Sequence, residues 1–175
     1  MFIICKKSAT PISGIGCENY TIERVELLRI GIVGAGAVAR SIHLPGLRLC
    51  PQVEIAAACD PDLAAARGLG VPRVFERAED LLASGDVDAV VVATPNHLHR
   101  EIVHAALAAG KHVLCEKPLA LNVGDALGMA RDAEASGLVH MTAFTYRFTP
   151  ALQYLRRLVD VGELGARCAR FGPRT

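Results

Sequence analysis

The stretch Ile30-Gly31-Ile32-Val33-Gly34-Ala35-Gly36-Ala37-Val38-Ala39 decides the fold class of this chain of 175 residues. An apolar run leads into Gly-x-Gly-x-x-Ala, and an Ala-rich segment follows, which is typical of a buried strand that turns directly into a helix. Gly34 permits the tight turn, Gly36 lets the backbone approach a pyrophosphate, and the small Ala39 allows the helix to pack on the strand. An ordinary strand–helix turn could have the same glycines. Whether they belong to a dinucleotide-binding site therefore depends on the rest of the sequence.

The sequence after this stretch alternates short apolar runs with longer Ala-rich segments, which indicates repeated βα units around a parallel sheet. The expected strands are Arg29–Val33, Val53–Cys59, Val74–Phe75, Ala89–Ala93, His112–Cys115 and Val139–Phe144. The expected helices are Ala37–Leu49, Pro61–Gly68, Ala78–Ala83, Leu98–Ala109 and Val123–Ser136. Pro45 should end or kink the first helix, Gly110 should close the fourth, and Asn122 with Asp125 should cap the fifth. The predicted fold class is α/β, a Rossmann-like doubly wound parallel sheet.

Both ends of the chain differ from this body. Residues 1–26 show no sustained period of 2 or 3.6, and we expect a loose extension there. Residues 27–147 form the predicted nucleotide-binding domain. In residues 148–175, a helix over Ala151–Val161 and a strand over Arg167–Phe171 look like the start of a second, α+β domain.

Composition narrows the range of partners. The chain has 19 basic and 18 acidic side chains, a net charge of +1, so neither nucleic acid nor an anionic membrane is expected to bind.

The six cysteines form no C-x-x-C pair, and no metal site is indicated. Cys59 and Cys115 lie in apolar runs and are expected to be buried free thiols. With no signal peptide or membrane span in the sequence, we expect a cytoplasmic protein.

An acidic residue follows the second predicted strand. Asp60 lies twenty-four residues after Gly36, close to the spacing of about twenty expected for a carboxylate that binds the adenosine ribose. A carboxylate there repels a 2′-phosphate, which favours NAD over NADP, although Arg40 or Arg67 could relax that choice. Asp60 could also cap a helix that begins at Pro61, and both roles could hold at once. Together with the N–H groups of Ala37 and Val38 at the helix N-terminus, Asp60 turns the glycine pattern into a predicted dinucleotide site.

Polar residues also follow the next two strands. Thr94-Pro95-Asn96-His97-Leu98-His99 and Glu116-Lys117-Pro118 fall at the carboxyl edge of the sheet, where open α/β folds bind ligands. Asn96 could simply cap the following helix, and the two histidines could be solvated. Lys117 could be a surface lysine paired with Glu116, or an amine beside a cofactor that donates to a hydroxyl or carbonyl oxygen.

These motifs, in this order, resemble the family of glucose–fructose oxidoreductase, inositol dehydrogenase and MocA-like oxidoreductases over residues 28–172. The resemblance implies NAD or NADP as cofactor and hydride transfer to or from a secondary alcohol or carbonyl of a sugar or cyclitol. It implies that Lys117 is catalytic and that Thr94, Pro95, Asn96, His99 and Glu116 belong to the cofactor pocket. Tyr146 and Arg147 then lie where the chain crosses toward a substrate domain.

The resemblance also implies a large second domain that supplies substrate contacts and a surface for a homo-oligomer. Only its first helix and strand are expected in this sequence. A dinucleotide-binding module without turnover is therefore the alternative to an active oxidoreductase.

Overall fold

The computed structural model describes residues 3–7, 20–24 and 27–164, with side chains from residue 27 onward. The chain divides into two units, Met1–Thr142 and Ala143–Thr175. The predicted strand Arg167–Phe171 lies outside the described residues.

The first unit contains a six-stranded parallel sheet in the order β5-β4-β3-β6-β7-β8. Its strands are β3 (Leu28–Val33), β4 (Val53–Cys59), β5 (Arg73–Phe75), β6 (Ala89–Val92), β7 (His112–Cys115) and β8 (His140–Thr142). Within this sheet, the first strand along the chain is the central β3. The chain then continues outward through β4 to β5 and returns to add β6 on the other side of β3. The carboxyl ends of β3 and β6 therefore flank the point where the strand order reverses, which is the ligand crevice of open α/β sheets.

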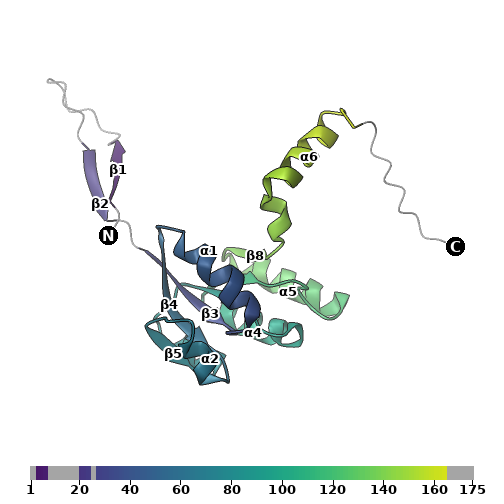
Figure 1. Ribbon diagram of the computed structural model, residues 1–175. Coiled ribbons are helices and arrows are strands. Elements are labelled where there is room, and N and C mark those ends of the chain that lie inside the picture. Colours follow the sequence, from purple (N-terminus) through teal and green to yellow (C-terminus); the bar gives the residue numbers. More distant parts are fainter. Residues whose placement is uncertain (1–2, 8–19, 25–26, 165–175) are drawn as a thin grey trace. The chain divides into compact units, whose positions relative to one another are not determined.

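Apolar side chains alternate between the two faces of the sheet, so both faces are buried. On one face Ile32 and Ala58 pack with α1 (Leu44–Arg48) and α2 (Leu63–Arg67). On the other face a larger core includes Val33, Leu81, Val90, Val92, Val103 and Met129. That core joins the sheet to α3 (Ala78–Ala83), α4 (His99–Ala108) and α5 (Val123–Ser136). Figure 1 labels α1, α2, α4 and α5 around the strands of this sheet. The predicted α/β doubly wound fold is confirmed.

The first helix widens before Pro45, as its sequence predicts in outline. Residues Ala39–His43 form a π-helical segment, in which the N–H of Leu44 donates to the carbonyl of Ala39, and α1 follows from Leu44. Proline has no N–H and its ring crowds the carbonyl four residues earlier, so the regular ladder cannot continue through it. The structure therefore has one wider turn at the position where the sequence predicts an end or a kink of the helix.

Two predicted helix ends are confirmed in detail. Gly110 adopts a φ of 72°, and the N–H of Lys111 closes the end of α4 on the carbonyl of Ala106 at 2.9 Å. The Asn122 Oδ1 accepts the N–H of Asp125 at 2.9 Å, and its amide donates to the Asp125 carboxylate at 2.6 Å. This is the expected reciprocal cap of α5.

Two further segments do not belong to the six-stranded sheet. Within the predicted loose extension, β1 (Ile3–Lys7) and β2 (Tyr20–Arg24) pair as an antiparallel hairpin. In the second unit, the short helix η3 (Thr145–Phe148) precedes α6 (Pro150–Asp160), one residue earlier at each end than expected. No helix among the described residues is long and apolar enough to span a membrane.

Candidate functional site

Gly34 fixes the turn between β3 and the first helix at the sheet's carboxyl edge. Its φ is 95°, and its N–H donates to the carbonyl of Cys59 at 2.8 Å. A Cβ at this position would lie 2.7 Å from the backbone of Ala93. Only glycine tolerates both the positive φ and this approach of the β6 backbone. The predicted reason for Gly34, a tight turn, is therefore present in the structure.

A cavity of about 610 Å³ opens directly beside this turn. Five of the predicted cofactor residues line it: Gly34, Gly36, Asp60, Thr94 and Pro95. They come from the ends of β3, β4 and β6, so the topology brings together motifs that are far apart in the sequence. The remaining wall is mostly apolar, with Leu82 from α3, Ile102 from α4 and Leu98 from the residue before α4. A concave, mostly apolar site with a few convergent polar groups is the usual form of a cofactor pocket.

The other residues of the glycine motif do not line this cavity. Ala37 and Val38 are exposed at the start of the helix, and Ala39 is fully buried in the core with Ile32. The small side chain of Ala39 thus serves helix–strand packing, as predicted. No neighbouring atom lies within 4 Å of the position where a Cβ on Gly36 would stand. The backbone of the turn is therefore open on the side where a pyrophosphate is expected.

Asp60 joins two backbone segments at the edge of the cavity. Its Oδ2 accepts the N–H of Ala35 at 2.8 Å, and its Oδ1 accepts the N–H of Asp62 at 2.9 Å. The alternative role as a helix cap is wrong, because α2 begins at Leu63 rather than Pro61. Asp62 is the cap, and its Oδ1 accepts from Ala64 and Ala65. Each Asp60 oxygen retains a lone pair for a further donor such as a ribose hydroxyl.

Two charged groups on the cavity wall contact each other, because Arg77 Nε donates to Glu79 at 3.3 Å. Arg40, which does not line the cavity, donates through Nε to the carbonyl of Ala35 at 2.9 Å. Hydrogen bonding by its own backbone N–H, and then by Arg77, lowers the pKa of Glu79. With Asp60 and Glu76 also in the wall, carboxylates outnumber Arg77 there. This charge balance disfavours a 2′-phosphate.

Thr94 provides a test of whether the cavity fits a polar ligand. Its Oγ1 is buried yet has no hydrogen-bond partner among the described residues. Buried hydroxyls are usually paired, because an unmade hydrogen bond costs about 1–3 kcal/mol. The open space at Gly36, the lone pairs of Asp60 and this unpaired hydroxyl together fit a dinucleotide along the ends of β3, β4 and β6.

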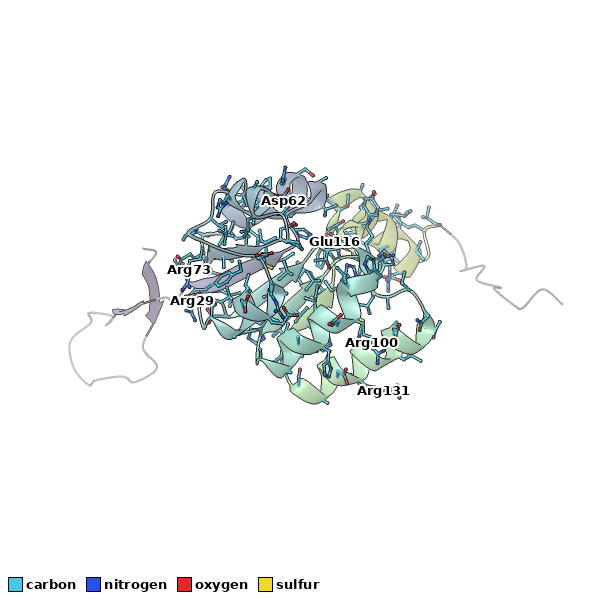
Figure 2. The ribbon with its side chains drawn as sticks, turned by 90° about the horizontal axis from the view of Figure 1, so that it is seen from below. Arg29, Asp62, Arg73, Arg100, Glu116 and Arg131 are labelled. Carbon is cyan, nitrogen blue, oxygen red and sulfur yellow. The ribbon has the colours of Figure 1, made fainter. Side chains whose placement is uncertain are left out.

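Glu116 and Lys117 lie at the end of β7, outside the cavity lining. Figure 2 shows Glu116 away from Arg29 and Arg73, which mark the opposite edge of the sheet. The Glu116 carboxylate accepts the ring N–H of His43 at 2.9 Å through Oε1 and the backbone N–H of Lys117 at 3.0 Å through Oε2. Lys117 is exposed, and no hydrogen bond or ion pair joins its Nζ to the described residues. The alternative in which Lys117 pairs with the Glu116 side chain is therefore wrong, because His43 holds that carboxylate.

His43 is a residue that the sequence analysis missed. It is 7% exposed and comes from the π-helical segment that follows the glycine turn. The only signal in the sequence is a histidine within an apolar helix, and its partner is 73 residues away.

His99 is completely buried at the start of α4. Its Nδ1 lies 3.0 Å from the carbonyl oxygen of Pro118 and its Nε2 lies 3.0 Å from that of Thr94. It links the loops after β6 and β7 and does not line the cavity. Asn96 begins the short helix η2 (Asn96–Leu98) but makes no side-chain cap, and His97 is exposed. Direct contact of Asn96, His99 or Glu116 with a cofactor stays a prediction.

Two thiols in the sheet are buried and unpaired, as expected. Burial, followed by the nearby charge of Asp60, raises the pKa of Cys59 to about 12. Burial and then Glu116 raise the pKa of Cys115 to about 12. Neither sulfur is a thiolate near neutral pH, so both serve as packing groups.

Tyr146 and Arg147 belong to the second unit. Both are exposed on η3. Their assignment to substrate stays a prediction. In the part of the chain with described side chains, no three His, Cys, Asp or Glu residues gather as a metal site.

Comparison with known proteins agrees with this geometry. Residues 28–144 match the model of the oxidoreductase family, NAD-binding Rossmann fold. Levoglucosan dehydrogenase of Pseudarthrobacter phenanthrenivorans is 34% identical over 79% of this chain and 38% of its own length. Myo-inositol 2-dehydrogenase of Thermotoga maritima is 32% identical over 79% of this chain and 42% of its own length.

Solved structures show the same likeness. Scyllo-inositol dehydrogenase from Lactobacillus casei, with bound NAD(H) and scyllo-inositol, has a TM-score of 0.74 and 32% identity, covering 80% of this chain and 43% of that one. A 3-ketoreductase from Actinomadura kijaniata in complex with NADP has a TM-score of 0.72 and 33% identity, covering 78% and 43%. The chain thus spans about two fifths of the length of these relatives. From the parallel sheet, the glycine turn and these matches together, the chain belongs to the oxidoreductase family with an NAD-binding Rossmann fold.

Proposed function

We propose that this chain is the cofactor-binding part of an enzyme that transfers hydride between a nicotinamide dinucleotide and a secondary alcohol or carbonyl of a sugar or cyclitol. The observation that carries the proposal is the joint placement of the glycine turn, Asp60 and Thr94 around one cavity at the carboxyl edge. The names of the relatives, which include an inositol dehydrogenase and levoglucosan dehydrogenase, support the substrate class.

The dinucleotide would be held by groups that the fold leaves able to make a further hydrogen bond. The open backbone at Gly36 and the N–H groups of Ala37 and Val38 would bind the pyrophosphate, which the partial positive charge of the helix N-terminus favours. Asp60 would accept hydrogen bonds from the adenosine ribose. Its charge, with those of Glu76 and Glu79, favours NAD over NADP. The bound dinucleotide supplies the hydride chemistry.

Lys117 would donate a proton to the substrate oxygen, or accept one from it in the reverse direction. Its exposed side chain has no described partner, so its ammonium is free to donate a hydrogen bond to a carbonyl or hydroxyl oxygen. Donation polarises a carbonyl toward hydride attack, and in the reverse direction the neutral amine accepts the proton from an alcohol. Glu116 would then act on Lys117 through its backbone N–H rather than as a second proton carrier.

Three wider assignments complete the proposal. Residues 27–147 would form the nucleotide domain, a boundary five residues past the end of the first compact unit, and residues from 148 onward would begin a substrate domain to which Tyr146 and Arg147 lead. That second domain would also carry the surface of a homo-oligomer. Because Cys59 and Cys115 are free thiols, a reducing compartment, the cytoplasm, is the expected location.

Titration of the chain with NADH tests the proposal, with the blue shift and enhancement of nicotinamide fluorescence as readout. We expect saturable binding that ADP-ribose displaces and that NADPH matches only weakly. A matched control is Gly34→Val, in which the added side chain would meet the Ala93 backbone and close the turn. Absence of saturable binding to the wild-type chain would overturn the proposed function.

A further inference from the structure

We propose that two buried histidines, His43 and His99, are positioning residues that fix the backbone of Lys117 from both sides. The inference rests on the proposed catalytic role of Lys117. The structure suggests it because Glu116 and Pro118, the two neighbours of Lys117, are each held by a different histidine from a different helix.

The first contact acts through Glu116. The carboxylate of Glu116 only accepts, so His43 must carry a proton on Nε2 to make its 2.9 Å bond to Oε1. The His43 and Glu116 side chains are 7% and 10% exposed, which shields the bond from solvent. The second oxygen of the same carboxylate then accepts the N–H of Lys117. His43 therefore orients the acceptor that orients the Lys117 peptide.

The second contact acts through Pro118. The carbonyl of Pro118 lies 3.0 Å from His99 Nδ1, and the ring's other nitrogen lies 3.0 Å from the carbonyl of Thr94. The ring is 0% exposed, so no solvent competes for either contact. Both partners are carbonyl oxygens, and a neutral ring has one N–H to donate. With that proton on Nδ1, His99 donates to the loop that carries Lys117, while its Nε2 lies beside the Thr94 carbonyl of the neighbouring loop.

Both histidines also connect Lys117 to the predicted cofactor site. His43 lies on the helix that begins at the glycine turn, and His99 contacts the backbone of Thr94, which lines the cavity. An exposed lysine on an unrestrained loop would sample many positions, and catalysis needs reacting groups held to within about 0.5 Å. Fixing the peptides around Lys117 leaves only its side-chain torsions free.

Two pairs of substitutions distinguish the effect of losing a hydrogen bond from the effect of changing the side-chain volume. Glutamine places an N–H donor near the Nε2 position of histidine, and asparagine places one near Nδ1. His43→Gln therefore keeps the donor to Glu116, whereas His43→Asn removes it. At the second site the order is reversed, because His99→Asn keeps the donor to Pro118 and His99→Gln removes it. His104→Gln is the surface control, since His104 is exposed and pairs with Asp132.

NMR of the chain measures the two contacts independently. The Lys117 N–H reports its bond to Glu116, and the Leu119 N–H shares a peptide plane with the Pro118 carbonyl. We expect His43→Asn to speed exchange of the Lys117 N–H about tenfold or more, the effect of losing a hydrogen bond to a charged group. We expect His99→Gln to lower the order parameter of the Leu119 amide from about 0.85 to below about 0.6. His43→Gln and His99→Asn should stay close to wild type.

Three outcomes would overturn the proposal. The first is equal behaviour of the two variants at either histidine. The second is a parallel change at the Lys111 amide, which closes α4 and depends on neither histidine. The third needs no variant: a Lys117 N–H that exchanges at the rate of an open loop in the wild-type chain. Failure of NADH to bind would count against the proposed function alone, because these measurements use no cofactor.

Discussion

The two edges of the parallel sheet differ in the partners of their lysines and in one buried hydroxyl. At the amino edge, Lys111 Nζ donates to the Val87 carbonyl at 2.8 Å, and Asp88 accepts the N–H, Nε and Nη2 of Arg29. At the carboxyl edge, Lys117 Nζ has no described partner, and the buried Thr94 hydroxyl is unpaired. Paired groups stabilise the fold, whereas unpaired groups at a ligand crevice remain available for binding and chemistry.

The two lysines allow the strongest test of this difference. In the complete enzyme that we propose, Lys117→Met should lower the turnover of nicotinamide-linked sugar or cyclitol oxidation about 10²–10⁴-fold, because it removes the proton donor, and should leave Tm unchanged. Lys111→Met should lower Tm and leave turnover unchanged, because it removes only a bond to Val87. Steady-state kinetics and thermal unfolding of both variants provide the measurements. If the two substitutions had the same pattern of effects, the two edges would not differ in role.

Gly34, at the carboxyl edge, is expected to contribute both to the stability of the fold and to cofactor binding. Gly34→Val should weaken NADH binding about 100-fold or more and lower the free energy of unfolding by about 2–3 kcal/mol, because it combines a positive φ with a clash against Ala93. Gly36→Ala is the matched control, since its Cβ would meet nothing within 4 Å. It should preserve stability and weaken only binding. Fluorescence titration and denaturant unfolding separate the two effects, and a destabilised Gly36→Ala chain would contradict this view.

The comparison also shows which features the sequence could predict. The strand Val53–Cys59 and the helix Val123–Ser136 were predicted with correct bounds, because apolar runs and capping residues are local signals. The pairing of His43 with Glu116 could not be predicted, because it joins residues 73 positions apart and depends on the wider turn before Pro45. Asp60 and Asp62 are equally good caps by residue type, and only the actual start of α2 at Leu63 distinguishes them.

Asp60 provides a test of cofactor choice that does not depend on Lys117. Asp60→Ser should raise the affinity for NADPH relative to NADH about tenfold, because it removes the carboxylate that repels a 2′-phosphate. Asp62→Ser is the control, since serine also caps helices and Asp62 is not among the residues that line the cavity. Competition titrations with both cofactors measure the ratio. An unchanged ratio in Asp60→Ser would assign cofactor choice to Glu76 and Glu79 instead.

Asp88 at the amino edge should contribute to the response of the fold to acid. Hydrogen bonds from the Arg29 side chain are the main cause of a lowered pKa at Asp88. A carboxyl whose pKa is lower in the folded chain stabilises the fold above its ordinary pKa near 3.8, and this stabilisation is lost as the pH falls through the folded value. Asp88 is 37% exposed on its side chain, so solvent screening keeps the effect small, about 2 °C in Tm. Asp88→Asn should therefore lower Tm slightly at pH 7, reduce its fall below pH 4, and leave NADH binding at the carboxyl edge unchanged.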